Sequence, residues 1–125
     1  MKITKSINVQ EPWFDYIKNK QKTIEGRLNK GIFSELNVGD EIIINKKKND
    51  MTIDYVEAKI IRITKYKSFE EYLSQEGLRR TLPGINTIED GENIYYKFYT
   101  KQDEEKYGIL AIRIVLIDME PQIVR

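Results

Sequence analysis

The sequence contains no histidine and no cysteine. These absences remove the usual base near neutral pH, the usual thiol nucleophile and most soft-metal ligands, and they exclude a disulfide scaffold. We therefore expect neither a metal site nor a cofactor, and any chemistry must use Lys, Glu, Thr or Tyr side chains. The lack of cysteine also fits a reducing compartment, so we expect a cytoplasmic protein.

A strong net charge and a long apolar segment are also missing. The formal net charge is +1 over 125 residues, so a nucleic-acid role would need a local basic patch. No apolar run approaches the roughly 18 residues that a membrane span needs, and the N-terminus lacks the apolar stretch of a signal peptide. We expect one domain over residues 1–125, a monomer that does not associate with membranes.

The most informative segment is KTIEGRL at residues 22–28, which carries an amine, a hydroxyl, a carboxylate and a guanidinium. If it is extended, its side chains alternate between two faces, with Lys22, Ile24 and Gly26 on one and Thr23, Glu25 and Arg27 on the other. A buried lysine can act as a base or nucleophile, and a neighbouring carboxylate can take its proton. The arginine offers a fork for phosphate or a base edge. A salt-bridged sheet edge is the alternative reading.

The pattern of apolar residues and breakers predicts strands separated by short helices. Strands are expected at residues 3–9, 22–28, 41–45, 55–65 and 108–117, helices at 12–20, 69–76, 87–99 and 100–107, a helical turn at 33–36 and an exposed hairpin loop at 46–50. Ser68 should cap the helix that Gly77 ends. The last strand is broken only by Arg113 and should be central in the sheet. These elements predict an α+β domain built on a curved sheet or small β-barrel.

Two further groups of residues could carry function. Glu76 is placed at a helix C-terminus, where the dipole can raise its pKa and suit it to acid–base work, although an exposed last-turn glutamate is the simpler reading. Lysines, arginines and tyrosines at 46–48, 65–67, 79–80 and 95–99 are typical of single-stranded RNA binding. The alternative is that the aromatic side chains are core and the lysines lie at loop tips.

The order of these motifs resembles the ASCH domain family along nearly the whole chain. The resemblance is carried by a short N-terminal strand, a helix with Trp13, Lys-Thr-x-Glu-x-Arg at 22–27, Val-Gly-Asp at 38–40, Ser-Phe-Glu-Glu at 68–71, Glu-Gly-Leu at 76–78 and Tyr-Gly-Ile-Leu-Ala-Ile-x-Ile at 107–114. It implies a PUA-like β-barrel with short peripheral helices, an association with RNA binding or modification, and a cleft lined by residues 22–27.

Some small bacterial ASCH proteins are similar to N4-acetylcytidine amidohydrolases, for which a Lys, a Thr three residues later and a Glu in the later helix are the proposed catalytic set. By position Lys22 matches the Lys and Glu76 the Glu. Glu25 occupies the Thr position, and Thr23 lies one residue after the Lys. An ionised carboxylate cannot donate the hydrogen bond of the hydroxyl, so the chain departs from that set at Glu25.

Two functions follow from this resemblance, both with RNA or a small nucleoside or nucleotide as the ligand. In a hydrolase, Glu76 would activate Lys22 or a water to attack an exocyclic amide. Thr23 or a backbone N–H would stabilise the oxyanion, and Arg27 would contact a phosphate or the base. In a non-catalytic RNA-binding module the same cleft would read single-stranded RNA. Its ligand-binding residues would then include Trp13, Arg27, Lys65 and Arg79.

Overall fold

The computed structural model describes residues 5–46 and 54–117 of the chain. The elements run β1 (Lys5–Val9), α1 (Trp13–Lys18), β2 (Ile24–Leu28), a 3₁₀ turn (Gly31–Glu35), β3 (Glu41–Lys46), β4 (Tyr55–Tyr66), α2 (Phe69–Glu76), α3 (Leu78–Thr81), α4 (Ile88–Tyr96), α5 (Lys101–Tyr107) and β5 (Ile109–Leu116). Beyond Lys46, the predicted hairpin loop lies outside the described residues. In the part of the chain described, no helix is long and apolar enough to cross a membrane.

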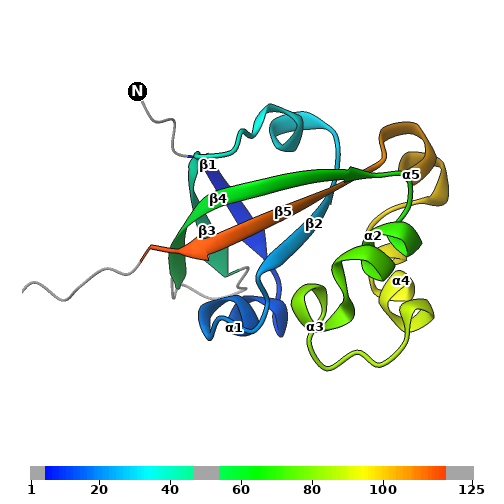
Figure 1. Ribbon diagram of the computed structural model, residues 1–125, viewed down its shortest axis with the longest axis horizontal. Coiled ribbons are helices and arrows are strands. Elements are labelled where there is room, and N and C mark those ends of the chain that lie inside the picture. The colour runs from blue at the N-terminus through cyan, green and yellow to red at the C-terminus, as the bar shows by residue number, and fades with distance from the viewer. Residues whose placement is uncertain (1–4, 47–53, 118–125) are drawn as a thin grey trace, which may run out of the picture.

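The five strands form one curled, mixed sheet in the order β1-β3-β4-β5-β2. Only β1 and β3 run parallel, and every other pair is antiparallel. The sheet is a half-barrel with β1 and β2 as its edges, and Figure 1 shows α2 to α5 gathered on one side of it with α1 apart from them. The predicted α+β class and curved, mostly antiparallel sheet are confirmed.

Strand β5 lies inside the sheet, paired with β4 on one side and β2 on the other, and its residues from Ile109 to Ile112 are buried on both faces. Leu110, Ile112 and Ile114 pack into one core cluster, which also holds Phe14 and Ile17 of α1. Ile109 and Ala111 face the other way, into a second cluster under α2 and α4. Trp13 packs against both clusters, and this places α1 at the junction of the two cores.

Local signals fix several element boundaries. The Ser68 side chain accepts a hydrogen bond from the backbone N–H of Glu71, and Gly77 ends α2 with φ of 88°, a value that favours glycine. Thr87 and Thr100 cap the next two long helices in the same way. The predicted helix over 87–99 is therefore too long, since α4 ends at Tyr96, and α3 was not predicted.

The prediction of an extended segment from Lys22 is also wrong at its start. The backbone N–H of Lys22 donates to the Tyr16 carbonyl at 2.9 Å, which holds the residue in the turn after α1. Strand β2 begins only at Ile24. Lys22 is therefore outside the alternation of the strand, and its side chain does not point away from Glu25.

Candidate functional site

A cavity of about 290 Å³ lies between the two edge strands of the half-barrel. Strands β1 and β2 supply one part of its wall, while α1, α4 and the turn after α4 supply the rest. Its lining residues are Asn8, Val9, Gln10, Trp13, Lys22, Glu25, Gly26, Arg27, Leu82, Ile94, Tyr95, Phe98 and Tyr99. We call this cavity the seam pocket, because it occupies the gap across which the sheet does not close.

Lys22 is anchored at the floor of the seam pocket, with a side chain that is 1% exposed. Its Nζ donates to the carbonyl oxygens of Ile24 at 2.6 Å and Thr81 at 2.5 Å, and lies 3.6 Å from Glu25 Oε1. Burial lowers the pKa of Lys22, while the Glu25 charge opposes that shift. The three N–H groups of an ammonium match these three acceptors, which leaves no lone pair facing the pocket.

Glu25 connects Lys22 to Arg27. Its Oε1 accepts from the backbone N–H of Gly26 at 3.1 Å, and its Oε2 accepts from Arg27 Nη2 at 3.3 Å. Burial raises the pKa of Glu25, but the charges of Lys22 and Arg27 outweigh it, so the net direction is downward. The carboxylate is therefore ionised at neutral pH and can only accept hydrogen bonds.

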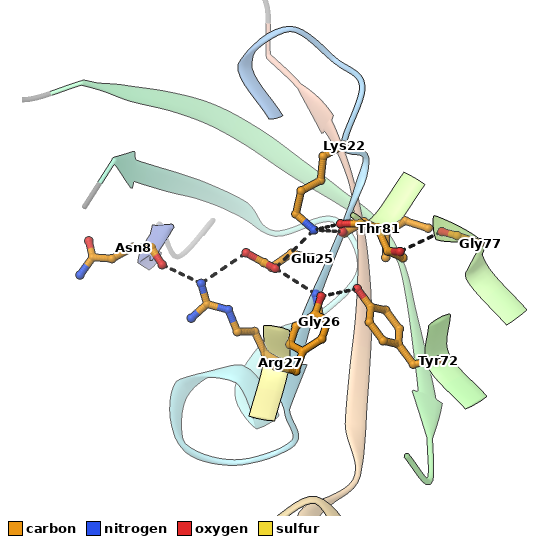
Figure 2. A network of polar contacts seen from close by, with 10 residues as sticks. Asn8, Lys22, Glu25, Gly26, Arg27, Tyr72, Gly77 and Thr81 are labelled. Carbon is orange, nitrogen blue, oxygen red and sulfur yellow. Dashed lines mark hydrogen bonds and ion pairs between the residues drawn. The ribbon is translucent and has the colours of Figure 1, made fainter. Parts of the chain in front are cut away.

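Arg27 spans the open edge of the sheet. Its Nη2 donates to the backbone carbonyl of Asn8 on β1 at 2.6 Å, and its guanidinium lies 4.8 Å from the centre of the Phe33 ring. Burial disfavours the charged form of Arg27, but the charge and the hydrogen bond of Glu25 outweigh it and raise the pKa of Arg27, so the group stays charged. Figure 2 shows the resulting chain of contacts from Thr81 through Lys22, Glu25 and Arg27 to Asn8. With all three side chains ionised, the floor carries one net positive charge.

Aromatic side chains form the opposite wall. The Tyr95 hydroxyl lies 3.0 Å from that of Tyr72, and the Tyr95 ring stacks on Phe69 at 4.6 Å between centroids. Burial raises the pKa of Tyr95 and of Tyr99, so both hydroxyls stay protonated. Phe98 is 57% exposed, an unusual position for a large apolar ring, and with Trp13 it adds aromatic surface to the wall.

Of the residues predicted to be catalytic or ligand-binding, Lys22, Glu25, Arg27 and Trp13 line the seam pocket, whereas Thr23, Glu76, Lys65 and Arg79 do not. The lining also includes Tyr95, Phe98 and Tyr99 from the aromatic group predicted at residues 95–99. Thr23 lines a second cavity of about 270 Å³ with Ile17 and residues of β5. Lys65 on β4 and Arg79 on α3 are exposed and do not line the pocket.

Glu76 also lies outside the seam pocket. Its Oε1 accepts from Arg62 Nη2 and its Oε2 from the Tyr66 hydroxyl, both at 2.5 Å. These contacts tie the end of α2 to β4 and leave Glu76 paired away from Lys22.

The lining residues that the sequence did not indicate are Asn8, Val9, Gln10, Leu82 and Ile94. Asn8 contributes a backbone carbonyl, and any residue type supplies one, so no sequence signal could have identified it. The described part of the chain holds no cluster of three acidic side chains that could bind a metal.

One family model and several solved structures match the chain. The model of the ASCH domain matches residues 7–118. The chain is 35% identical to hypothetical protein PH0355, known from a crystal structure, with 92% of this chain and 100% of that one covered and a TM-score of 0.81. It is 32% identical to protein PF0455 from Pyrococcus furiosus, solved by NMR, with 94% and 100% covered and a TM-score of 0.73.

A crystallised mutant of ZmASCH from Zymomonas mobilis shares the fold at 14% identity and a TM-score of 0.52, with 90% of this chain and 66% of that one covered. Among proteins with curated descriptions, none matches significantly.

Proposed function

Because the chain belongs to the ASCH domain family, we propose that the seam pocket binds one unstacked nucleobase of a single-stranded RNA or of a nucleotide. The observation that carries this proposal is the Lys22–Glu25–Arg27 chain, fixed and charged beneath aromatic side chains. ASCH domains resemble PUA-like modules, which are associated in general with RNA. A base is a planar ligand whose faces stack on aromatic rings and whose edge carries hydrogen-bonding groups.

The size of the pocket supports a single base. At about 290 Å³ it lies near the lower end of the roughly 300–1,000 Å³ typical of small-molecule pockets. Such a space accommodates one base with its sugar outside, and excludes a stacked run of bases. The net positive charge at the floor favours a ligand with a phosphate close by.

Binding is better supported than hydrolysis. A nucleophilic amine needs a free lone pair, whereas the Lys22 ammonium faces three acceptors. The other residue of the proposed catalytic pair, Glu76, is bonded to Arg62 and Tyr66. Thr23, whose hydroxyl was assigned to the oxyanion, lines a different cavity. We assign Lys22 the role of fixing Glu25 and the carbonyl of Thr81 at the pocket floor.

Trp13 provides the test, because it is the only tryptophan in the chain and lines the seam pocket. Short single-stranded RNA and free nucleoside monophosphates should each change its fluorescence on binding, with the RNA binding more tightly if phosphates outside the pocket are also contacted. RNA affinity should then fall as salt rises, because phosphate contacts release counterions. No fluorescence change and no retention of RNA in a gel-shift assay would refute the proposal.

A pair of arginine variants gives the matched control. Arg27→Met removes the guanidinium from the pocket and should weaken binding about tenfold or more, the cost of losing a charge-assisted hydrogen bond. Arg79→Met removes an equal charge from an exposed site on α3 and should change affinity less than threefold. Equal losses in the two variants would mean that surface charge alone binds RNA.

Incubation with N4-acetylcytidine separates binding from hydrolysis. We expect no cytidine to appear, even at high protein concentration. Release of cytidine that disappears in Lys22→Met would restore the hydrolase reading and assign Lys22 to it.

A further inference from the structure

The outer edge of β2 presents backbone groups to the seam pocket in a fixed pattern. Thr23 accepts from Ile114 at 3.0 Å and Asn29 donates to Gly108 at 3.0 Å, so the odd-numbered residues of this strand bond to β5. The N–H and C=O groups of the even-numbered residues, Ile24, Gly26 and Leu28, consequently point to the open edge. Two hydrogen bonds agree with this direction, from Lys22 Nζ to the Ile24 carbonyl and from the Gly26 N–H to Glu25 Oε1.

Of these three outward carbonyls, two are already occupied. Lys22 occupies that of Ile24, and the Lys30 N–H occupies that of Leu28 at 2.8 Å. Within residues 5–46 and 54–117, the Gly26 carbonyl has no hydrogen-bond partner. Gly26 is buried and lines the seam pocket. A buried carbonyl without a hydrogen-bond partner lowers the stability of the fold, so the Gly26 oxygen is placed to accept a hydrogen bond from a ligand N–H.

The polar groups of the pocket floor follow one another in a defined order. Glu25 Oε1 lies against the Gly26 N–H and Oε2 against Arg27, which places the carboxylate between the Gly26 backbone and the guanidinium. The order is therefore acceptor, acceptor, donor, read from Gly26 through Glu25 to Arg27. The hydrogen bonds of Arg27 to Asn8 and to Glu25 both use Nη2, and Nε and Nη1 carry three further N–H groups.

We infer that the seam pocket selects guanine, an inference that rests on the proposed binding of a nucleobase there. The Watson–Crick edge of guanine presents its amino group, its ring N–H and its carbonyl oxygen in that order. The amino group donates to the Gly26 carbonyl, the ring N–H donates to Glu25, and the carbonyl oxygen accepts from Arg27. Cytosine places two acceptors and one donor on this edge, uracil has a donor between two acceptors, and adenine has one acceptor and one amino group. None of these three edges matches all three groups of the floor.

The test compares nucleotides on the unaltered protein. Guanosine, inosine, adenosine, cytidine and uridine monophosphates are titrated while Trp13 fluorescence is followed. Guanosine monophosphate should bind at least about tenfold more tightly than each of the others, because a site built for a hydrogen bond rejects ligands that lack it. Inosine is the sharpest comparison, since it differs from guanosine only by the amino group assigned to the Gly26 carbonyl.

Two results would overturn the inference in different ways. Similar affinities for all five nucleotides would refute guanine selection and leave the proposed base-binding function standing. No binding of any nucleotide or RNA would refute both. As a second measurement, Glu25→Gln should reduce the preference for guanosine monophosphate to less than threefold if the variant folds. Glu105→Gln, on the exposed surface of α5, should keep the preference.

Discussion

Replacing Lys22 with methionine tests whether the charged floor holds the seam pocket together. Methionine preserves most of the side-chain length but donates no hydrogen bond, so the carbonyls of Ile24 and Thr81 lose their Nζ donor and Glu25 keeps Arg27 as its one charged partner. Leaving a buried acceptor without its donor costs about 1–3 kcal/mol, and Lys22→Met does this to two carbonyls, so the loss should be about 2–6 kcal/mol. That is a large part of the roughly 5–15 kcal/mol by which a domain is stable.

The assay is urea unfolding followed by circular dichroism at neutral pH. We expect Lys22→Met to lower the free energy of unfolding by about 2–6 kcal/mol. The double variant Lys22→Met/Glu25→Gln also leaves the Arg27 guanidinium without its carboxylate, so it should be less stable than Lys22→Met. Lys65→Met, at an exposed position of β4, should stay within about 0.5 kcal/mol of the parent. A loss below about 1 kcal/mol in Lys22→Met would refute the reasoning, because one unmet buried carbonyl alone should cost that much.

Three further predictions concern packing and pH. Gly26→Ala should lower the free energy of unfolding, measured in urea, by about 1–3 kcal/mol, because the added Cβ would lie 2.5 Å from Tyr72 Cζ and overpack the site. An unchanged midpoint would show that the Tyr72 ring can move. The pKa of Glu25 in the folded protein lies below its ordinary value of 4.5, so the ionised carboxylate stabilises the fold above about pH 4.5, and this contribution is lost as the pH falls through the folded pKa. When the free energy of unfolding is measured at a series of acid pH values, it should therefore fall less in Glu25→Gln than in the parent protein. Burial and, after it, the hydrogen bond to Glu76 raise the pKa of Tyr66 to about 12, so the free energy of unfolding should fall as the pH rises from about 10 to 12. Glu76→Gln should lower the pKa of Tyr66, measured by phenolate absorbance with Tyr66→Phe as the blank.

The fold was predictable where a local signal agreed with a tertiary one. Ser68 and Gly77 mark the start and the end of α2, as expected. The apolar residues on both faces of 109–116 predicted an inner strand, and β5 lies inside the sheet. The start of β2 was not predictable, since it depends on a hydrogen bond between Lys22 and the Tyr16 carbonyl. Alternation assumes an extended backbone, whereas the backbone of Lys22 is still held in the turn after α1.

The candidate site was predictable in its charged residues and not in its geometry. The spacing of Lys22, Glu25 and Arg27 indicated a polar cluster, but not that Lys22 and Glu25 would meet. Glu76 was expected to act as an acid–base group at a helix end, whereas it is paired with Arg62 and Tyr66 of β4, the strand that precedes α2. Nothing in the spacing of these residues indicated that pairing. Edge carbonyls such as those of Asn8 and Gly26 belong to the backbone and carry no residue signature at all.

The strand order has a consequence for synthesis on the ribosome. Strands β1 and β2 are consecutive among the strands in sequence, yet they occupy opposite edges of the sheet, and the sheet partner of β2 is β5, the last strand to be made. As the chain grows from its N-terminus, β2 has no sheet partner until residues 109–116 emerge and insert between β4 and β2. The segment with Lys22, Glu25 and Arg27 is made early, but its charged side chains stay in water until β5 is made and pairs with β2.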